Sequence, residues 1–410
     1  MEFLRPCYPL LFHVLRLFLH ALLVVLKQFL RLLLVPTMLR RRFFSKPYES
    51  SRVLVVGGGF AGTAVCKRLQ SSFNTTLLTN ETYFEFSPSI LRATVEPEHF
   101  QHIQISYADL LDDTSVVTGL ALDIDPVRKQ VATTVGAVPY DYLVVCTGSS
   151  SRPPHACRNA IPAYDGANLQ PSYAQLMDVN CASVVIIGGG VVGVELAAEL
   201  LETFPTKRVS IITSAETLLT RSPPGVVRYC LRFLEQFSDR FALYLNCKVK
   251  SVKGNVYETT NGDQVVGDMA YFCTGIQPNV SVFRSHFEDS IKVGGWVSVR
   301  PSLQLDTIVE NSSVVFVAGD LIDVHEEKLA QTAQAHASVV ASNIMRLEAT
   351  RRSRRSRASG QLVEYRTTLR PMLISMGKYE GVLVWGSLFF TGLIPSLMKE
   401  FVEWKETNGF

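Results

Sequence analysis

Two glycine-rich loops have the residue types and the spacing that point most directly to chemistry. Both follow the pattern GxGxxG, with glycines at Gly57, Gly59, Gly62, Gly188, Gly190 and Gly193. In such a loop the first glycine permits a tight turn, the second lets the backbone approach a pyrophosphate, and the third lets a helix pack closely on a strand. The N-terminus of that helix offers free N–H groups to the phosphates. The spacing predicts two dinucleotide sites, and Phe60 and Ala61 in the first loop are expected to contact its cofactor.

For this chemistry each loop must lie between a strand and a helix, and the flanking residues have those patterns. Residues 51–56 form an apolar strand pattern before the first loop, and residues 63–69 have a helical pattern after it. Residues 182–187 and 194–200 repeat the strand and the helix around the second loop. One GxGxxG alone is weak evidence, because glycine-rich turns are common. Two complete strand–loop–helix units in one chain make an accidental match remote.

The next strand of each unit ends without the acidic residue that usually binds the adenosine ribose. Thr79 ends the first such strand, with Glu81 just beyond it, and Thr213 and Ser214 end the second. Either hydroxyl contacts replace the carboxylate at the first site, or Glu81 reaches the ribose. At the second site the missing acid leaves NADH and NADPH both open. Arg221 is placed to meet a 2′-phosphate, although an ordinary surface cation is the preferred interpretation.

Length and composition indicate a globular protein with more than one domain. The 410 residues are too many for one hydrophobic core, and 47% of them are hydrophobic against 19% charged. The net charge of +3 is too small to argue for nucleic acid. The eight cysteines form no CxxC or CxxxxC pair, which argues against a disulfide scaffold or a metal site and fits a reducing compartment.

The first 46 residues have a pattern of their own. No acidic residue lies between Glu2 and Glu49, and residues 10–35 are mostly Leu, Val and Phe. The polar side chains of this stretch are His13, Arg16, His20, Lys27, Gln28 and Arg31, and most of them fall on one narrow helical stripe. A membrane span needs roughly 20 apolar residues, and Lys27 and Arg31 interrupt this one. We therefore predict a helix that lies in a membrane interface. A mitochondrial presequence ranks second, a signal anchor stays open, and a helix packed on the globular body ranks last.

Three later motifs give the chain a family resemblance. Residues 141–148 and 268–275 each have the pattern of a strand that ends in a Thr-Gly turn, and residues 314–320 end in Gly-Asp. The turn residues are Thr147, Gly148, Thr274, Gly275, Gly319 and Asp320. With the two loops, these motifs resemble the pyridine nucleotide–disulfide oxidoreductase superfamily over roughly residues 51–345. The resemblance implies FAD in the first fold, NAD(P)H in the second, crossings between them at the Thr-Gly turns, and a bond from the Asp320 carboxylate to the ribitol.

Within the superfamily the chain is similar to ferroptosis suppressor protein, to apoptosis-inducing-factor relatives and to type II NADH dehydrogenases. The segments that carry this likeness are residues 82–88, 193–199, 328–335 and 376–382. The resemblance implies that Glu195 lies near the nicotinamide. It also implies that Lys328, at the start of a helix against the flavin, stabilises negative charge on the reduced cofactor.

The electron acceptor is predicted from what the chain lacks and from its two ends. Cys66 stands alone in the first helix, so no cysteine pair lies where disulfide reductases carry one, and a small acceptor such as a quinone is expected. Residues 382–390 and 393–398 form a dense apolar patch with Lys399 and Lys405 beside it. Such a patch is typical of membrane contact. A packed capping element or a dimer interface ranks almost equally, so a homodimer stays open.

The prediction is an α/β protein with two Rossmann-like domains, the NAD(P) domain inserted into the FAD domain, a small C-terminal α+β region and an N-terminal amphipathic helix. The expected segments are 1–50 for membrane or targeting, 51–155 and 286–345 for FAD, 156–285 for NAD(P)H, 346–362 as a basic linker, and 363–410 as a membrane or interface region.

The expected activity passes a hydride from NAD(P)H to FAD and electrons on to a quinone-type acceptor. A redox-sensing flavoprotein and a reductase of a protein acceptor are the alternatives. The expected location is a membrane of the mitochondrion, or the surface of the endoplasmic reticulum or lipid droplets, with the cytosolic face left open. No metal and no nucleic acid is expected.

Overall fold

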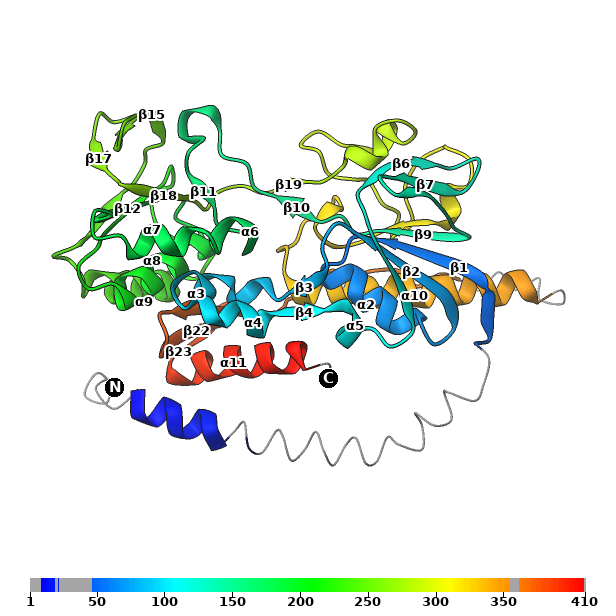
Figure 1. The fold of residues 1–410 in the computed structure, drawn as a ribbon, viewed down its shortest axis with the longest axis horizontal. Helices are drawn as coiled ribbons and strands as arrows, with labels where there is room; N and C mark the ends of the chain where they lie inside the picture. Colours follow the sequence, from blue (N-terminus) through cyan, green and yellow to red (C-terminus); the bar gives the residue numbers. More distant parts are fainter. Residues whose placement is uncertain (1–8, 19–20, 22–45, 165, 354–360, 409–410) are drawn as a thin grey trace.

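The computed structural model describes residues 9–18, 21, 46–164, 166–353 and 361–408. Two bodies of sheet and helix lie side by side, and the C-terminal helix runs beneath them (Figure 1). Within the described ranges, no helix is both long and apolar enough to cross a membrane. In the same ranges, no group of His, Cys, Asp and Glu side chains is arranged to hold a metal ion.

The first sheet has five parallel strands in the order β20-β9-β1-β2-β5. Its strands are β1 (Tyr48–Val56), β2 (Phe73–Thr79), β5 (Thr114–Thr118), β9 (Tyr142–Val145) and β20 (Val315–Val317). β20 follows the whole second sheet in the sequence, so the chain leaves the first body and returns to complete it. Helices α2 (Phe60–Leu69) and α10 (Ala330–Arg352) pack against each other in this body.

The second sheet repeats this plan with the parallel order β11-β18-β12-β13-β14. Its strands are β11 (Ile161–Pro162), β12 (Ser183–Ile187), β13 (Arg208–Ile212), β14 (Phe241–Tyr244) and β18 (Met269–Phe272). Helices α8 (Val191–Thr203) and α9 (Pro224–Glu235) belong to this body. The two chain crossings pair with each other as the antiparallel strands β10 (Ser149–Ser150) and β19 (Gln277–Pro278).

Smaller elements fill the edges of the two bodies. The strands are β3 (Tyr83–Glu85), β4 (Gln104–Ser106), β6 (Ala121–Asp125), β7 (Gln130–Thr133), β8 (Gly136–Pro139), β15 (Val249–Lys253), β16 (Val256–Thr259) and β17 (Gln264–Val266). The helices are α3 (Ile90–Val95), α4 (Phe100–Ile103), α5 (Tyr107–Leu110), α6 (Gly166–Leu169) and α7 (Ser172–Met177).

The C-terminal region is an antiparallel sheet followed by a helix. Its strands are β21 (Met372–Met376), β22 (Glu380–Trp385) and β23 (Leu388–Gly392), and its helix is α11 (Leu393–Thr407). Gly377 has φ +67° in the turn between β21 and β22, a conformation that favours glycine. α11 packs on this sheet, and its Glu403 lies 3.0 Å from His99 of the first body. The predicted α/β class, with two Rossmann-like units and a C-terminal α+β region, is confirmed.

The N-terminal helix (residues 9–18) packs on the C-terminal region. The Phe12 ring is fully buried, with its centroid 5.2 Å from that of Tyr379. Arg16 forms an ion pair of 2.9 Å with Glu400 of α11. The predicted helix is therefore present. The interpretation that was ranked last, a helix packed on the globular body, is the one that the structure shows for these residues. Phe12 and Arg16 contact the C-terminal region, while the helix keeps exposed apolar side chains such as Leu17 and Phe18. The predicted interruptions at Lys27 and Arg31 lie outside the described residues.

The start of the expected basic linker is helical instead. α10 continues to Arg352, because Glu348, buried completely, accepts hydrogen bonds from Arg351 and Arg352 at 2.8 and 2.5 Å. The Ser51 hydroxyl donates to the same carboxylate at 2.8 Å, which ties the end of α10 to β1. These donors hold the pKa of Glu348 at about 2.

Candidate active site

A cleft of about 1390 Å³ is lined by residues of both bodies and of the C-terminal region. It brings together most of the predicted site residues: Gly59, Phe60, Ala61, Gly148, Gly188, Gly190, Glu195, Thr274, Gly275, Gly319, Asp320 and Lys328. Single ligand pockets are commonly about 300 to 1,000 Å³. The cleft is therefore large enough for more than one small molecule.

The first loop fits a dinucleotide by its packing. Gly57 has φ +104°, and a Cβ there would lie 2.3 Å from the carbonyl oxygen of Cys146. A Cβ on Gly62 would lie 1.9 Å from the carbonyl oxygen of Gly57. At Gly59, by contrast, a Cβ would meet no described atom within 4 Å, because this glycine faces the cleft. α2 begins at Phe60 without a side-chain cap, so its first N–H groups are available to a phosphate.

The second loop has the same construction. Gly188 has φ +129°, and a Cβ there would lie 2.6 Å from the carbonyl oxygen of Cys273. A Cβ on Gly193 would lie 2.0 Å from the carbonyl oxygen of Gly188, whereas a Cβ on Gly190 would meet no described atom within 4 Å. α8 begins at Val191, also without a side-chain cap. Both loops thus have two glycines required by packing and one that leaves room for a ligand.

Asp320 lies at the carboxyl end of β20, where a buried network fixes its turn. Gly319 has φ +82°, and its N–H donates to Nδ1 of His336 at 3.2 Å. The Ser149 hydroxyl donates to Asp320 at 2.9 Å. Burial raises the pKa of Asp320, while the Ser149 hydrogen bond and the charge of Lys328 lower it. The carboxylate lines the cleft beside the first loop, as a contact with a flavin side chain requires.

Lys328 lines the cleft, but from a loop. α10 begins at Ala330, so the expectation that Lys328 starts the helix is wrong. The ammonium donates to the carbonyl oxygens of Ile322 and Val324 at 2.8 and 3.2 Å, and lies 5.0 Å from the centre of the Trp296 ring. The Lys328 side chain is therefore hydrogen-bonded to earlier residues of its own loop. Burial lowers the pKa of Lys328.

Glu195 of α8 is the buried carboxylate at the opposite wall. Its side chain accepts hydrogen bonds from the backbone N–H and the hydroxyl of Ser375 at 2.6 and 2.9 Å, and from the ammonium of Lys399 at 2.7 Å. Lys399 also contacts the Ser375 hydroxyl and lines the cleft. The sequence pattern places Lys399 only beside the apolar patch and gives no signal for Ser375. Both partners lie about 200 residues from Glu195 in the chain, so no local pattern signals the contact.

Five predicted site residues support the walls rather than line them: Gly57, Gly62, Thr79, Thr147 and Gly193. The glycines are needed for close packing, as described above. Thr79 is buried, and its hydroxyl accepts from the N–H of Glu81 at 3.2 Å. The Thr147 hydroxyl donates to the carbonyl of Asn279 at 2.7 Å, and so joins the two crossings. The expected ribose contacts of Thr79 and Glu81 remain predictions.

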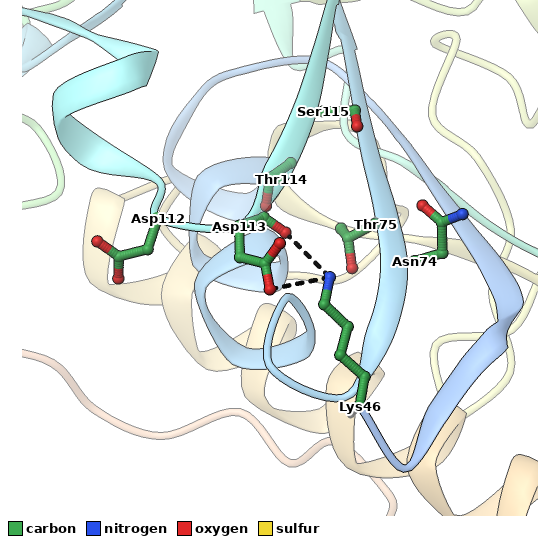
Figure 2. Close-up of a pocket in the computed structure, with 7 residues that line it drawn as sticks. All are labelled: Lys46, Asn74, Thr75, Asp112, Asp113, Thr114 and Ser115. Carbon is green, nitrogen blue, oxygen red and sulfur yellow. Dashed lines mark hydrogen bonds and ion pairs between the residues drawn. The ribbon is translucent and has the colours of Figure 1, made fainter. Parts of the chain in front are cut away.

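A second hollow, of about 300 Å³, lies apart from the cleft. Figure 2 shows Lys46, Asp113 and the first residues of β2 and β5 around it. The ammonium of Lys46 lies 3.0 Å from the Asp113 carboxylate. Ligands of open parallel sheets bind at the carboxyl ends of the strands. This hollow lies instead at the amino ends of β2 and β5.

Comparison with known proteins agrees with this geometry. A family model described as pyridine nucleotide-disulphide oxidoreductase matches residues 51–337. The chain belongs to this family. It is an FAD-dependent pyridine nucleotide oxidoreductase, with FAD and NAD(P)H as its cofactors. The matched residues contain both glycine loops, both Thr-Gly turns and Asp320.

Curated relatives and solved structures cover most of the chain. Ferroptosis suppressor protein 1 of Taeniopygia guttata is 31% identical over 81% of this chain and 88% of its own length. Apoptosis-inducing factor homolog B of Dictyostelium discoideum is 28% identical over 82% of this chain and 89% of its own length. Among solved structures, the sulfide:quinone oxidoreductase of Aquifex aeolicus has a TM-score of 0.74 at 20% identity, over 88% of this chain and 92% of that one. NDH2 of Plasmodium falciparum, solved with NADH, has a TM-score of 0.71 at 12% identity, over 88% of this chain and 98% of that one.

The family name includes a disulfide, but the thiols described here do not form one. Seven cysteines lie in the described ranges, and all are free and buried. Burial raises the pKa of Cys146 and of Cys230 to about 12, so both stay protonated thiols at neutral pH.

Proposed function

We propose that this oxidoreductase transfers electrons from NAD(P)H to a quinone at a membrane surface. The balanced reaction consumes NAD(P)H, one proton and a quinone, and yields NAD(P)⁺ and a quinol. The observation that carries the proposal is an apolar wall of the cleft next to the Glu195–Lys399 pair. This wall is formed by Pro88, Ile90, Leu91, Met372 and Leu373.

In this reaction the side chains around the cleft position the cofactors and set the charge beside them. FAD, when bound, accepts the hydride and passes electrons on. Glu195 is fixed by Ser375 and neutralised by Lys399. When NAD(P)H is bound, this carboxylate would accept a hydrogen bond from the nicotinamide carboxamide and orient that ring. On the other wall Lys328 and Asp320 set the charge beside the cofactor, and each stabilises the ionised form of the other.

The acceptor is assigned to quinones because the wall offers apolar contact. The cysteines that also line the cleft are buried and form no disulfide: Cys146, Cys157, Cys247 and Cys273. A quinone ring is flat, apolar and without charge, and it suits a pocket lined mainly by hydrophobic side chains. The solved structure from Aquifex aeolicus, which shares this fold, is named a sulfide:quinone oxidoreductase.

The membrane assignment rests on exposed apolar side chains at the two chain ends. Leu388, Phe390 and Ile394 of the C-terminal region are 63%, 65% and 71% exposed, and Leu17 and Phe18 of the N-terminal helix are each 70% exposed. The helix is docked on α11, so both groups belong to one region of the molecule (Figure 1). Apolar surface with basic side chains beside it is typical of membrane contact.

Anaerobic titration tests the reaction. NADH or NADPH should bleach the visible absorbance of the flavin, and a short-chain ubiquinone should restore it within the mixing time of a rapid assay. Ferricyanide serves as a control acceptor that needs no quinone pocket. A protein that reduces ferricyanide but leaves ubiquinone untouched would contradict the proposed acceptor.

Flotation with anionic liposomes tests the membrane face. A Leu388→Ser/Ile394→Ser variant should lose roughly tenfold or more in liposome affinity, because each buried aliphatic side chain contributes about 1.5–3 kcal/mol. The matched control is Val293→Ser/Ile308→Ser, since both of these aliphatic side chains are also exposed but lie in the first body. Equal flotation of the two variants would show that the C-terminal patch does not bind lipid.

A further inference from the structure

The carboxyl end of β13 is where a Rossmann fold distinguishes NADH from NADPH, and here it has an unusual set of charges. Thr213 and Ser214 follow the strand, and both line the cleft. Their neighbours in this end of the cleft include the cations Arg221 and Lys248. Among the described residues of the second body, Glu195 on α8 is the acidic residue that lines the cleft, and it lies beyond the second loop.

These charges favour a phosphate over a bare hydroxyl. A carboxylate at this strand end would accept a hydrogen bond from the ribose 2′-OH and repel a 2′-phosphate. Hydroxyl groups and cations do the reverse, because a phosphate ester carries close to two negative charges and needs donors and positive charge. Ser214 and Lys248 are both exposed, so they are accessible to a ligand in the cleft.

Arg221 already holds an anion across the cleft. Its guanidinium lies 3.3 Å from the carboxylate of Glu327, a residue of the loop that precedes α10. Both side chains line the cleft, and they come from different bodies of the protein. A 2′-phosphate would therefore compete with Glu327 for Arg221. The Glu327 carboxylate marks a position where this part of the cleft accommodates negative charge.

We propose that the cleft contains a subsite for the 2′-phosphate of NADPH, formed by Ser214, Arg221 and Lys248, and that Glu327 opposes its occupation by pairing with Arg221. The inference rests on the proposed oxidoreductase reaction and names NADPH as its preferred donor. It predicts variants with higher as well as lower affinity for a 2′-phosphate, because removing the Glu327 charge frees Arg221 for the ligand.

Binding of fragments tests the subsite without turnover. The FAD-loaded full chain is titrated by calorimetry with 2′,5′-ADP and with 5′-AMP, which share the adenosine and its 5′-phosphate and differ only in the 2′-phosphate. The 2′-phosphorylated fragment should bind about tenfold more tightly, and Lys248→Ala or Arg221→Ala should remove most of that advantage. Glu327→Gln should strengthen binding of 2′,5′-ADP about two- to fivefold, the range of an exposed ion pair.

Steady-state kinetics with a fixed acceptor gives the second readout, the ratio of kcat/KM for NADPH to that for NADH. The ratio should fall about tenfold in Lys248→Ala and in Ser214→Asp, and rise in Glu327→Gln. Lys250→Ala is the matched control, because Lys250 is an exposed lysine of β15 that pairs with Glu258 at 2.9 Å and does not line the cleft. Its ratio should equal that of the wild type.

The outcomes separate this inference from the proposed function. Equal affinity for the two fragments, or a Glu327→Gln variant that binds 2′,5′-ADP less well, would overturn the subsite. A protein that prefers 2′,5′-ADP and responds to Glu327→Gln, but reduces no quinone, would retain the subsite and lose the proposed acceptor.

Discussion

His336 offers a quantitative test of how the fold holds the FAD motif. The side chain is completely buried on α10, with Nδ1 accepting from the Gly319 N–H and Nε2 lying 2.8 Å from the Glu326 carboxylate. Because Nδ1 is an acceptor, the neutral ring carries its proton on Nε2, and this N–H donates a hydrogen bond to the Glu326 carboxylate. The Tyr365 ring packs against the imidazole at a centroid distance of 4.4 Å. Burial lowers the pKa of His336 from 6.5 to about 4, although the Glu326 carboxylate raises it.

The sign and the size of the effect follow from that pKa. Between pH 6.5 and pH 4 the unfolded chain binds a proton that the folded chain does not, so the stability of the fold is complete above that window and decreases as the pH falls through it. From pH 7 to pH 5 the loss is about 2 kcal/mol, and its limit below pH 4 is about 3 kcal/mol. The lost stability applies to the part of the chain that positions Gly319, so FAD should dissociate more easily in the same window.

The comparison of the wild type with His336→Gln isolates this residue, because every other group titrates in both proteins. Urea unfolding, followed by the rise in flavin fluorescence, gives the free energy of unfolding of each protein at pH 7, 6 and 5. The variant should be less stable at pH 7, and the difference should shrink by about 2 kcal/mol at pH 5. A difference that stays constant over this range would refute the assignment of a neutral, proton-excluding His336.

Two further predictions concern the cleft. Lys399→Ala leaves Glu195 buried beside Ser375 without its cation, so stopped-flow reduction of the flavin by NAD(P)H should slow by about tenfold to a hundredfold, whereas Lys399→Arg should retain most of the rate. Gly59→Ala should fold with a normal thermal midpoint but lose FAD affinity, because its added Cβ meets only the space for the ligand. Gly57→Ala should lose FAD and several kilocalories of stability, because its Cβ would overlap the Cys146 carbonyl, and thermal unfolding of the apoproteins separates the two cases.

The dinucleotide units could be predicted because each is local in the sequence. A strand, a glycine loop and a helix lie within about twenty consecutive residues, and the glycines are fixed by backbone geometry at Gly57 and Gly188. The return of the chain to the first sheet was also predictable, since the Gly319-Asp320 motif follows the second loop. The family resemblance assigned this motif to the FAD fold, which implies that the second unit is an insertion, and β20 does join the first sheet.

The rest of the site depends on contacts between distant segments, which no local pattern encodes. Ser375 and Lys399 reach Glu195 only because β21 and α11 pack against the second body. Lys328 lies in the loop before α10, where its ammonium donates to the carbonyl groups of Ile322 and Val324, six and four residues earlier. The Arg221–Glu327 pair joins two bodies, so the sequence alone favoured a surface cation at Arg221.

The contacts of α11 also decide how membrane dependence has to be measured. Lys399 and Glu400 are consecutive residues, yet Lys399 pairs with Glu195 in the cleft while Glu400 pairs with Arg16 of the N-terminal helix. A C-terminal deletion would therefore remove apolar surface and the cation of Glu195 in one step, and lost activity would not distinguish the two causes. Substitutions of exposed side chains such as Ile394 change the surface and leave both ion pairs in place. Only such variants can show whether quinone reduction depends on the membrane.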